Sequence, residues 1–247
     1  MFFTRIPCSG FVEYSQDYLD KSSRYFPLVG WIVGVVGAIV IWIGNLFLPL
    51  PLTVLLSMIA TILLTGAFYE DGFIDVCDGF GGGWTKERIL EIMKDSRIGA
   101  FGAIGMVLLF ALKLLSLVYL PIVLLPMALI AGHSLSRFAS VSLLFTHDYV
   151  RADALSKSKP LARRMTQREF LVAGVFGLTP LLLLSFFGVS LWRLALCLVI
   201  IWIARWYLAR YFTRWIGGYT GDCLGAVQQI TEVIFYLTLV VEVWKST

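Results

Sequence analysis

Charged side chains are scarce in this chain of 247 residues. Asp, Glu, Lys and Arg together make up 15% of it, whereas soluble domains carry about 25%. Hydrophobic residues make up 59%, above the roughly 45–50% of soluble domains, and the mean hydropathy is +0.84. We therefore expect an integral membrane protein. The net charge of +4 is modest, so it does not favour binding to nucleic acid.

Paired cysteines are also missing. Cys8, Cys77, Cys197 and Cys223 show no close pairing, and two of them fall in segments expected to be cytoplasmic, where thiols stay reduced. Neither a disulfide framework nor a zinc site is expected. The first ten residues lack the apolar core and cleavage site of a secretory signal. No internal repeat or low-complexity linker divides the chain, so we expect one domain over residues 1–247.

Long apolar runs take up much of the chain. A transmembrane helix needs about 20 apolar residues, and seven segments qualify: 26–50, 52–69, 100–120, 122–145, 170–188, 191–211 and 226–244. Pro49 and Pro51 force a turn between the first two. The predicted fold class is all-α, a polytopic membrane bundle of about seven transmembrane helices. A cytoplasmic acidic loop and a short amphipathic helix at the interface are expected between the second and third spans.

The basic residues predict the orientation of the bundle. With a cytoplasmic N-terminus, sixteen of the twenty Lys and Arg residues lie in cytoplasmic segments, and only Arg193 and Lys245 lie on the opposite side. Positively charged loops stay in the cytoplasm. We therefore expect a multi-pass protein of the cytoplasmic membrane of a prokaryote, with its N-terminus and its acidic run, residues 70–79, in the cytoplasm.

The acidic run is the strongest functional signal. Asp71, Asp75 and Asp78 are spaced i, i+4, i+7, so on a helix they project from one face. Like charges in that arrangement repel, and a divalent cation held by oxygen ligands relieves the repulsion. The sequence therefore predicts a metal site at a membrane surface, with Glu70 at the start of the same run.

The rest of the segment from residue 70 to residue 102 suits an anion. Four of the five residues 79–83 are glycines, Gly81 and Gly82 among them, and backbone N–H groups there can approach an anion closely. Thr85 is a candidate N-cap for the amphipathic helix. Asp95 adds a further acid, and the guanidinium of Arg97 can bind phosphate in a bidentate way.

Four further features carry alternatives. Asp222, among glycines before the last span, is either a metal ligand, part of a phosphate-facing helix N-terminus, or an N-cap. Lys113 and Arg137 lie inside spans, where a charge must be paired or face a wet cavity. They either hold a phosphorylated substrate or pair with Glu232 or with a carboxylate in the loops. For His133, hydrogen-bonded packing is favoured over ligation. The basic segment 151–168 suits anionic lipid headgroups, and Arg151 is assigned to the substrate.

Acids for a divalent cation, glycine-rich backbone and guanidinium groups together suit a polyphosphate substrate. A Mg²⁺ ion would bridge phosphate oxygens while an alcohol attacks in line. The reaction class that these residues predict is transfer of a phosphoryl-alcohol group from a nucleotide-activated donor at the cytoplasmic face.

Three motifs, together with Lys113 and the pair Ser136-Arg137, resemble the cobalamin synthase family, which has adenosylcobinamide-GDP ribazoletransferase activity. The motifs are Glu-Asp-Gly-x2-Asp-x2-Asp-Gly at residues 70–79, the run at 89–99 that ends Asp-Ser-Arg-Ile-Gly, and Gly-x-Thr-Gly-Asp-x-Leu-Gly-Ala at 218–226. The resemblance spans essentially the whole chain in the family's order. At residues 228–229 this chain has Gln-Gln, where some members have Glu at the second position.

The resemblance implies a Mg²⁺-dependent membrane enzyme that completes the nucleotide loop of vitamin B12. The 3′-hydroxyl of α-ribazole, or of its 5′-phosphate, would attack the phosphorus joined to cobinamide in adenosylcobinamide-GDP and expel GMP. It implies metal ligands at Asp71, Asp75 and Asp78, with Glu70 and Asp95 as ligands or close supports. Arg97, Lys113 and Arg137 would neutralise phosphate, with Ser136 beside them. Asp222 would contact a second metal or orient the acceptor hydroxyl.

Two other functions share some of these features. A CDP-alcohol phosphotransferase is also an aspartate-rich membrane enzyme, but its second motif, Gly-x3-Asp-x3-Asp, is missing here. A transporter would use intramembrane charges, yet transporters show inverted repeats and broken helices at mid-membrane. The oligomeric state is left open, with a homo-oligomer as one alternative.

Overall fold

The computed structural model describes Thr4, residues 21–150 and residues 165–246, with side chains described as far as Val241. No strand forms within these ranges, where one isolated parallel bridge joins Tyr149 to Tyr219. The elements are η1 (Ser23–Tyr25), α2 (Phe26–Gly44), α3 (Leu50–Thr65), α4 (Phe68–Gly82), α5 (Lys86–Ile92), α6 (Ala100–Val118), α7 (Leu125–Val141), α8 (Leu143–Thr146), α9 (Gln167–Leu183), η2 (Leu184–Phe187), α10 (Leu191–Ile216) and α11 (Gly221–Ser246).

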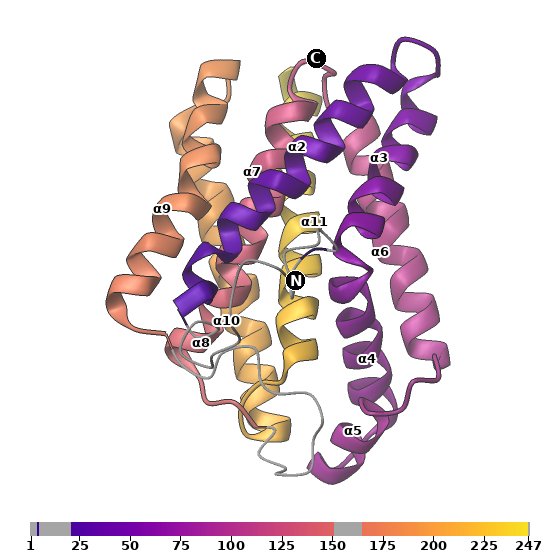
Figure 1. Ribbon diagram of the computed structural model, residues 1–247, viewed down its shortest axis with the longest axis vertical. Coiled ribbons are helices and arrows are strands. Elements are labelled where there is room, and N and C mark those ends of the chain that lie inside the picture. The colour runs from indigo at the N-terminus through magenta and orange to yellow at the C-terminus, as the bar shows by residue number, and fades with distance from the viewer. Residues whose placement is uncertain (1–3, 5–20, 151–164, 247) are drawn as a thin grey trace, which may run out of the picture.

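The long helices form a bundle whose members run up and down past one another (Figure 1). In the described ranges, six helices are long and apolar enough to cross a membrane, and α3 with α4 forms a seventh, bent unit. The predicted all-α membrane bundle of about seven spans is therefore confirmed. The large apolar side chains that remain exposed, such as those of Trp42, Leu108 and Tyr207, face outward, where lipid would cover them.

The bend between α3 and α4 differs from the uninterrupted span expected at residues 52–69. Gly66 and Ala67 both have positive φ, 71° and 60°, which ends α3 in the left-handed region. The chain then turns by 90° into α4. The acidic run, which the sequence placed in a loop, is therefore helical from its first residue to its last.

Helix α7 lies at the centre of the bundle, and almost all of its side chains are buried. Helix α2 crosses it closely because glycine stands at the contact. A Cβ on Gly30 would lie 2.4 Å from the carbonyl oxygen of His133, and one on Gly34 would lie 2.5 Å from Cα of Ile130. The spacing Gly-x3-Gly lets two membrane helices pack backbone against backbone.

Helix α11 packs against both α7 and α4, and its contact with α4 determines where Asp222 lies. A Cβ on Gly72 would lie 3.0 Å from Cα of Asp222, and one on Gly225 would lie 3.0 Å from the carbonyl oxygen of Tyr69. Two glycines thus hold the start of α11 against the acidic part of α4. Residues far apart in the sequence, at 72 and 222, meet at this contact.

Helix α5 is the short helix that the sequence predicts, and Thr85 is its N-cap: the Thr85 hydroxyl accepts from Arg88 N at 3.3 Å. Its apolar face is buried, with Ile89 and Met93 packed on Gly79 and Gly83 of the α4 end. Helix α5 therefore packs against the end of α4. Its polar side carries Arg88 and Glu91, which pair at 2.7 Å.

Candidate active site

The four acids of α4 divide between the outside and the inside of the bundle. Asp71 is exposed and Asp75 is half-buried, whereas Glu70 and Asp78 are buried. All four residues lie in α4, so the i, i+4, i+7 spacing falls on a helix where a loop was expected. Their environments differ so much that they cannot share one role.

Asp78 caps the next transmembrane helix. Its two carboxylate oxygens accept from the backbone N–H groups of Gly99 at 2.7 Å and Gly102 at 2.8 Å, at the start of α6. A Cβ on either glycine would lie 2.4 Å from that carboxylate, so both positions need glycine. A carboxylate there satisfies two N–H groups and interacts favourably with the helix dipole. This structural role differs from the metal-ligand role that the sequence predicts for Asp78.

The glycine-rich stretch also differs from the anion-binding loop that was expected. Gly81 and Gly82 lie in the last turn of α4, where their N–H groups belong to the helix, and Gly83 N donates to the Gly79 carbonyl at 2.9 Å. A Cβ on Gly81 would lie 2.5 Å from the ring of Phe101. Gly81 and Gly83 thus allow close packing against α6 and α5, whereas Gly82 is exposed.

The predicted four-acid metal site does not form as a cluster. In the described part of the chain, no three His, Cys, Asp or Glu side chains lie where they could hold one metal ion. Glu70 points inward and accepts a hydrogen bond from Gln229, and Asp78 accepts a hydrogen bond at the start of α6. Asp71 and Asp75 remain as the acids of this run that are open to solvent. Two carboxylates fit Mg²⁺, which commonly takes one or two protein carboxylates and completes its shell with water and substrate phosphate.

Asp222 is brought to the same end of α4 by the glycine contact with α11. Its hydroxyl neighbour Thr220 is the cap of α11, since the Thr220 Oγ1 accepts from Cys223 N at 3.4 Å. The N-cap alternative for Asp222 is therefore wrong. Thr220 also donates to the Asp222 carboxylate at 3.3 Å. An acid in the first turn of α11, beside Gly72, is placed to act together with the acids of α4.

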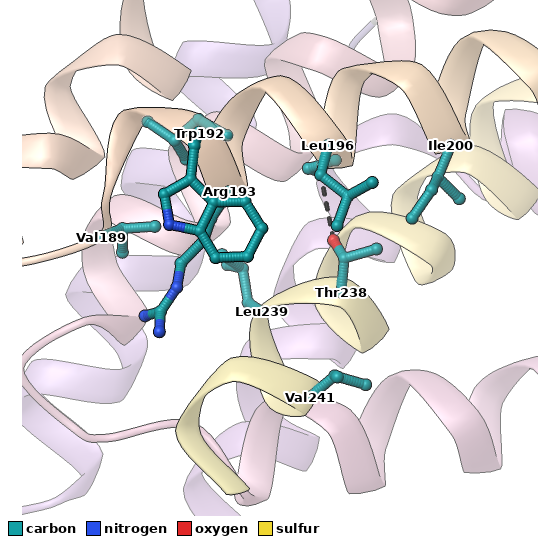
Figure 2. Close-up of a pocket in the computed structure, with 10 residues that line it drawn as sticks. Val189, Trp192, Arg193, Leu196, Ile200, Thr238, Leu239 and Val241 are labelled. Carbon is teal, nitrogen blue, oxygen red and sulfur yellow. Dashed lines mark hydrogen bonds between the residues drawn. The ribbon is translucent and has the colours of Figure 1, made fainter. Parts of the chain in front are cut away.

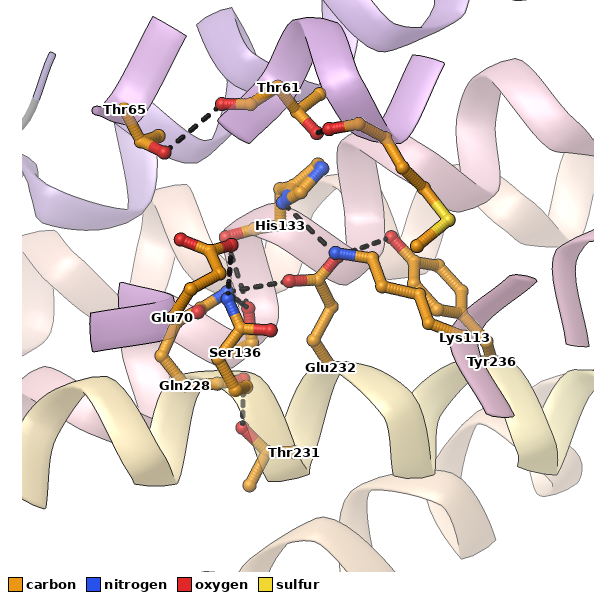
Figure 3. A network of polar contacts seen from close by, with 12 residues as sticks. Thr61, Thr65, Glu70, Lys113, His133, Ser136, Gln228, Thr231, Glu232 and Tyr236 are labelled. Carbon is orange, nitrogen blue, oxygen red and sulfur yellow. Dashed lines mark hydrogen bonds and ion pairs between the residues drawn. The ribbon is translucent and has the colours of Figure 1, made fainter. Parts of the chain in front are cut away.

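A second group of polar residues lies inside the bundle and centres on Glu232 of α11 (Figure 3). The Glu232 carboxylate pairs with Lys113 Nζ at 2.7 Å and lies 3.3 Å from His133 Nδ1. It also accepts from Tyr236 OH at 3.0 Å and from Gln228 Nε2 at 2.7 Å. This one carboxylate therefore connects α6, α7 and α11.

Arg137 and Ser136 belong to this group. One Arg137 nitrogen donates to the His133 carbonyl at 2.9 Å, and its guanidinium lies 4.6 Å from the centre of the Tyr69 ring. Ser136 Oγ accepts from Gln228 Nε2 at 3.0 Å. Of the two alternatives for Lys113, the structure has the pairing with Glu232. His133 has the hydrogen-bonded packing role that the sequence favours.

Glu70 joins this group to the acidic helix. Its Oε1 accepts from Gln229 Nε2 at 2.8 Å. Between Glu70, His133, Arg137 and Glu232 lies a cavity of about 10 Å³, which is space for about one water molecule. It admits no phosphate group, and in this structure Lys113 pairs with Glu232, Ser136 with Gln228 and Arg137 with the His133 carbonyl.

Asp95 and Arg97 pair with each other on the surface. The Arg97 guanidinium donates to the Asp95 carboxylate at 2.6 Å, and these hydrogen bonds lower the pKa of Asp95 to about 2. The Arg97 side chain is 88% exposed. The pair lies in the loop between α5 and α6, away from Glu70. Arg151, the remaining predicted substrate residue, lies outside the described residues.

One buried residue was not singled out from the sequence. Arg205 was counted only among the basic loop residues, but it lies within α10 and is buried. Its Nε donates to Ser142 Oγ at 2.9 Å, and it also donates to the Ser142 carbonyl and to Thr146 Oγ1. It thereby binds the carbonyl end of α7, where a cation is favoured. Next to this contact, burial and then the charge of Arg205 lower the pKa of His147.

Comparison with known proteins decides the family. The family model described as cobalamin-5-phosphate synthase matches residues 1–240. The chain belongs to this family. The adenosylcobinamide-GDP ribazoletransferase of Ralstonia pickettii is 50% identical over 249 residues, which covers 100% of this chain and 94% of the relative.

Two other relatives of the same name match the chain to a similar extent. The protein of the same name from Shewanella frigidimarina is 47% identical over 96% of this chain and 90% of its own length, and that of Ralstonia nicotianae is 45% identical over 100% and 93%. The resemblance seen in the sequence motifs is thus confirmed. No solved structure matches the chain.

The cap on α6 leads to a prediction about Asp78. Replacing Asp78 by Asn removes one acceptor and the charge at the start of α6, so the free energy of unfolding should fall by about 1–2 kcal/mol. The matched change Asp71→Asn, on the exposed face of the same helix, should leave the free energy of unfolding unchanged. Thermal unfolding of the purified protein in detergent measures both. If Asp78→Asn melted like the native chain, the capping role would be wrong.

The buried pair leads to a second prediction. The substitution Lys113→Met leaves Glu232 with a buried charge and no cation at 2.7 Å, so the protein should lose about 3–5 kcal/mol of stability. Adding Glu232→Gln removes that charge, and the double variant should regain most of the loss. Unfolding of the two single variants and the double variant gives the coupling energy. Simple additivity would contradict the pairing.

Proposed function

We propose that this protein joins adenosylcobinamide-GDP to α-ribazole, or to its 5′-phosphate, and releases GMP. The observation that carries the proposal is the identity of 45–50% along essentially the whole chain to relatives named adenosylcobinamide-GDP ribazoletransferase. The family match extends over the same length.

Magnesium is part of this proposal. Asp71 and Asp75 are the acids of α4 that would hold Mg²⁺, and Asp222 lies at the neighbouring start of α11. A bound Mg²⁺ would bridge and neutralise the phosphates of the nucleotide donor. Asp71 is exposed and Asp75 half-buried, so a large donor can reach this end of α4 without entering the bundle.

Several neighbouring residues hold α4 in position. Gly72 and Gly225 let α11 approach it, and Asp78 ties it to α6. Glu70, held by Gln229, anchors the first turn of α4 inside the bundle. Asp222 is in place to orient the attacking hydroxyl. Arg97, on the exposed loop, remains a predicted phosphate contact. Its guanidinium would release the Asp95 carboxylate and bind a substrate phosphate instead.

The charge distribution supports a location for the protein. We place the protein in the cytoplasmic membrane of a prokaryote, with the α5 end of the bundle in the cytoplasm. Lys86, Arg88, Lys94 and Arg97 all lie near that end, which is the side that basic residues favour. The acids of α4 would then meet a soluble nucleotide-activated donor directly.

Release of GMP by the detergent-purified protein tests the proposal. Given adenosylcobinamide-GDP and α-ribazole, the protein should release GMP and form a cobalamin product with Mg²⁺ and not with chelator. A CDP-alcohol phosphotransferase would instead release CMP from a CDP-alcohol, and a transporter would act only across a sealed vesicle. Absence of GMP with either acceptor form, from folded protein, would overturn the proposal.

The substitution Asp75→Asn tests the residue assignment. It should abolish GMP release and leave the protein folded in the membrane, because it removes one charge from a group of like charges. Glu87→Gln, which changes an exposed acid on α5, is the control and should retain turnover. Normal turnover in Asp75→Asn, or loss of folding in place of activity, would contradict the assignment.

A further inference from the structure

A second cavity lies at the other end of the molecule, far from the acids of α4. It has a volume of about 270 Å³ and is enclosed by the first turns of α10 and the later turns of α11 (Figure 2). The far end of α10 approaches α5, where Gly217 lies close to Lys86 Nζ. With 26 residues, α10 is about 39 Å long. The cavity is therefore separated from the candidate active site by most of the membrane thickness.

The interior of this cavity is apolar. Leu194, Leu196, Ile200, Leu239 and Val241 supply its walls. Thr238 is the polar exception, but its hydroxyl donates to the Phe235 carbonyl at 2.7 Å and lies 3.1 Å from Cys197 Sγ. The walls therefore accommodate a hydrocarbon chain and offer no polar contact along their length.

The mouth of the cavity is basic and aromatic. Arg193 and Trp192 both line it, with the guanidinium 5.5 Å from the centre of the Trp192 ring. Trp is typical of the headgroup level of a membrane. Arg can bind phosphate through two parallel hydrogen bonds. The polar mouth thus lies where a lipid headgroup lies, and the groove runs from it into the hydrocarbon region.

The start of α10 adds to the attraction for an anion at this mouth. Trp192 and Arg193 belong to the first turn of α10, and both line the cavity. The positive end of the α10 dipole lies at this turn. The dipole and the Arg193 charge together complement a phosphate group.

We propose that this groove binds one phospholipid from the leaflet opposite α5. Its phosphate lies at Arg193 and the start of α10, and one acyl chain lies between α10 and α11. A second copy of this chain would have to fill a narrow groove with a side chain, whereas the membrane supplies a ligand with the required anionic head and apolar tail. This proposal does not depend on the proposed transferase activity.

Retention of lipid by the purified protein tests the groove. The full chain is reconstituted with phosphatidylglycerol, returned to detergent and passed through gel filtration, and the lipid phosphorus per protein is measured. Arg193→Gln should lower retention at least fivefold because it removes the headgroup contact. Leu196→Trp should do the same by filling the groove.

Two controls make the result specific. Val199→Trp places the same bulk on an exposed position of α10 that does not line the groove, and Arg88→Gln removes a cation at the other end; both should retain lipid like the native chain. Diacylglycerol, which has the chains without the phosphate, should not be retained. Equal retention by Leu196→Trp and Val199→Trp, or a dimer dissociated by Leu196→Trp with no change in lipid, would overturn the proposal.

Discussion

Charge that is buried in a membrane must be paired, and this constraint organises the centre of the bundle. Glu232 is fully buried, and Lys113, Tyr236 and Gln228 each contact its carboxylate, with His133 close by. These partners come from α6, α7 and α11, and α11 lies far along the chain from the other two helices. A carboxylate left alone in hydrocarbon would cost several kcal/mol. The helices α6, α7 and α11 therefore have to meet at this point, and their packing positions the rest of the site.

The acidic helix depends on the same centre. Its first turn is anchored by the contact between Glu70 and Gln229, and its last turns are tied to α6 through Asp78. Between these two fixed points lie Asp71 and Asp75, which face outward. The motif of four acids thus combines two buried residues that hold the helix with Asp71, which is exposed, and Asp75, which is half-buried. The proposal assigns the metal to this second pair only.

Part of this could be predicted from the sequence. Run lengths of about 20 apolar residues locate most of the spans. The acidic run was expected in a loop, although its i, i+4, i+7 spacing is that of one helix face. The Thr85 cap is likewise visible locally. The role of Asp78 is not, because its partners Gly99 and Gly102 lie 21 and 24 residues further on. The Glu70–Gln229 contact joins residues 159 apart. The bend at Gly66–Ala67 was missed because hydropathy continues across it.

The central claim is that Asp71 and Asp75, and not the whole acidic run, hold a divalent cation together with the donor phosphates. Binding of Mn²⁺ in place of Mg²⁺, followed by electron paramagnetic resonance on the purified protein, tests it most directly. With the GDP-bearing donor present, Mn²⁺ should bind, and Asp71→Asn or Asp75→Asn should weaken binding at least tenfold, whereas Glu70→Gln should leave it within about threefold. Unchanged Mn²⁺ binding in the Asp71 and Asp75 variants would contradict the account.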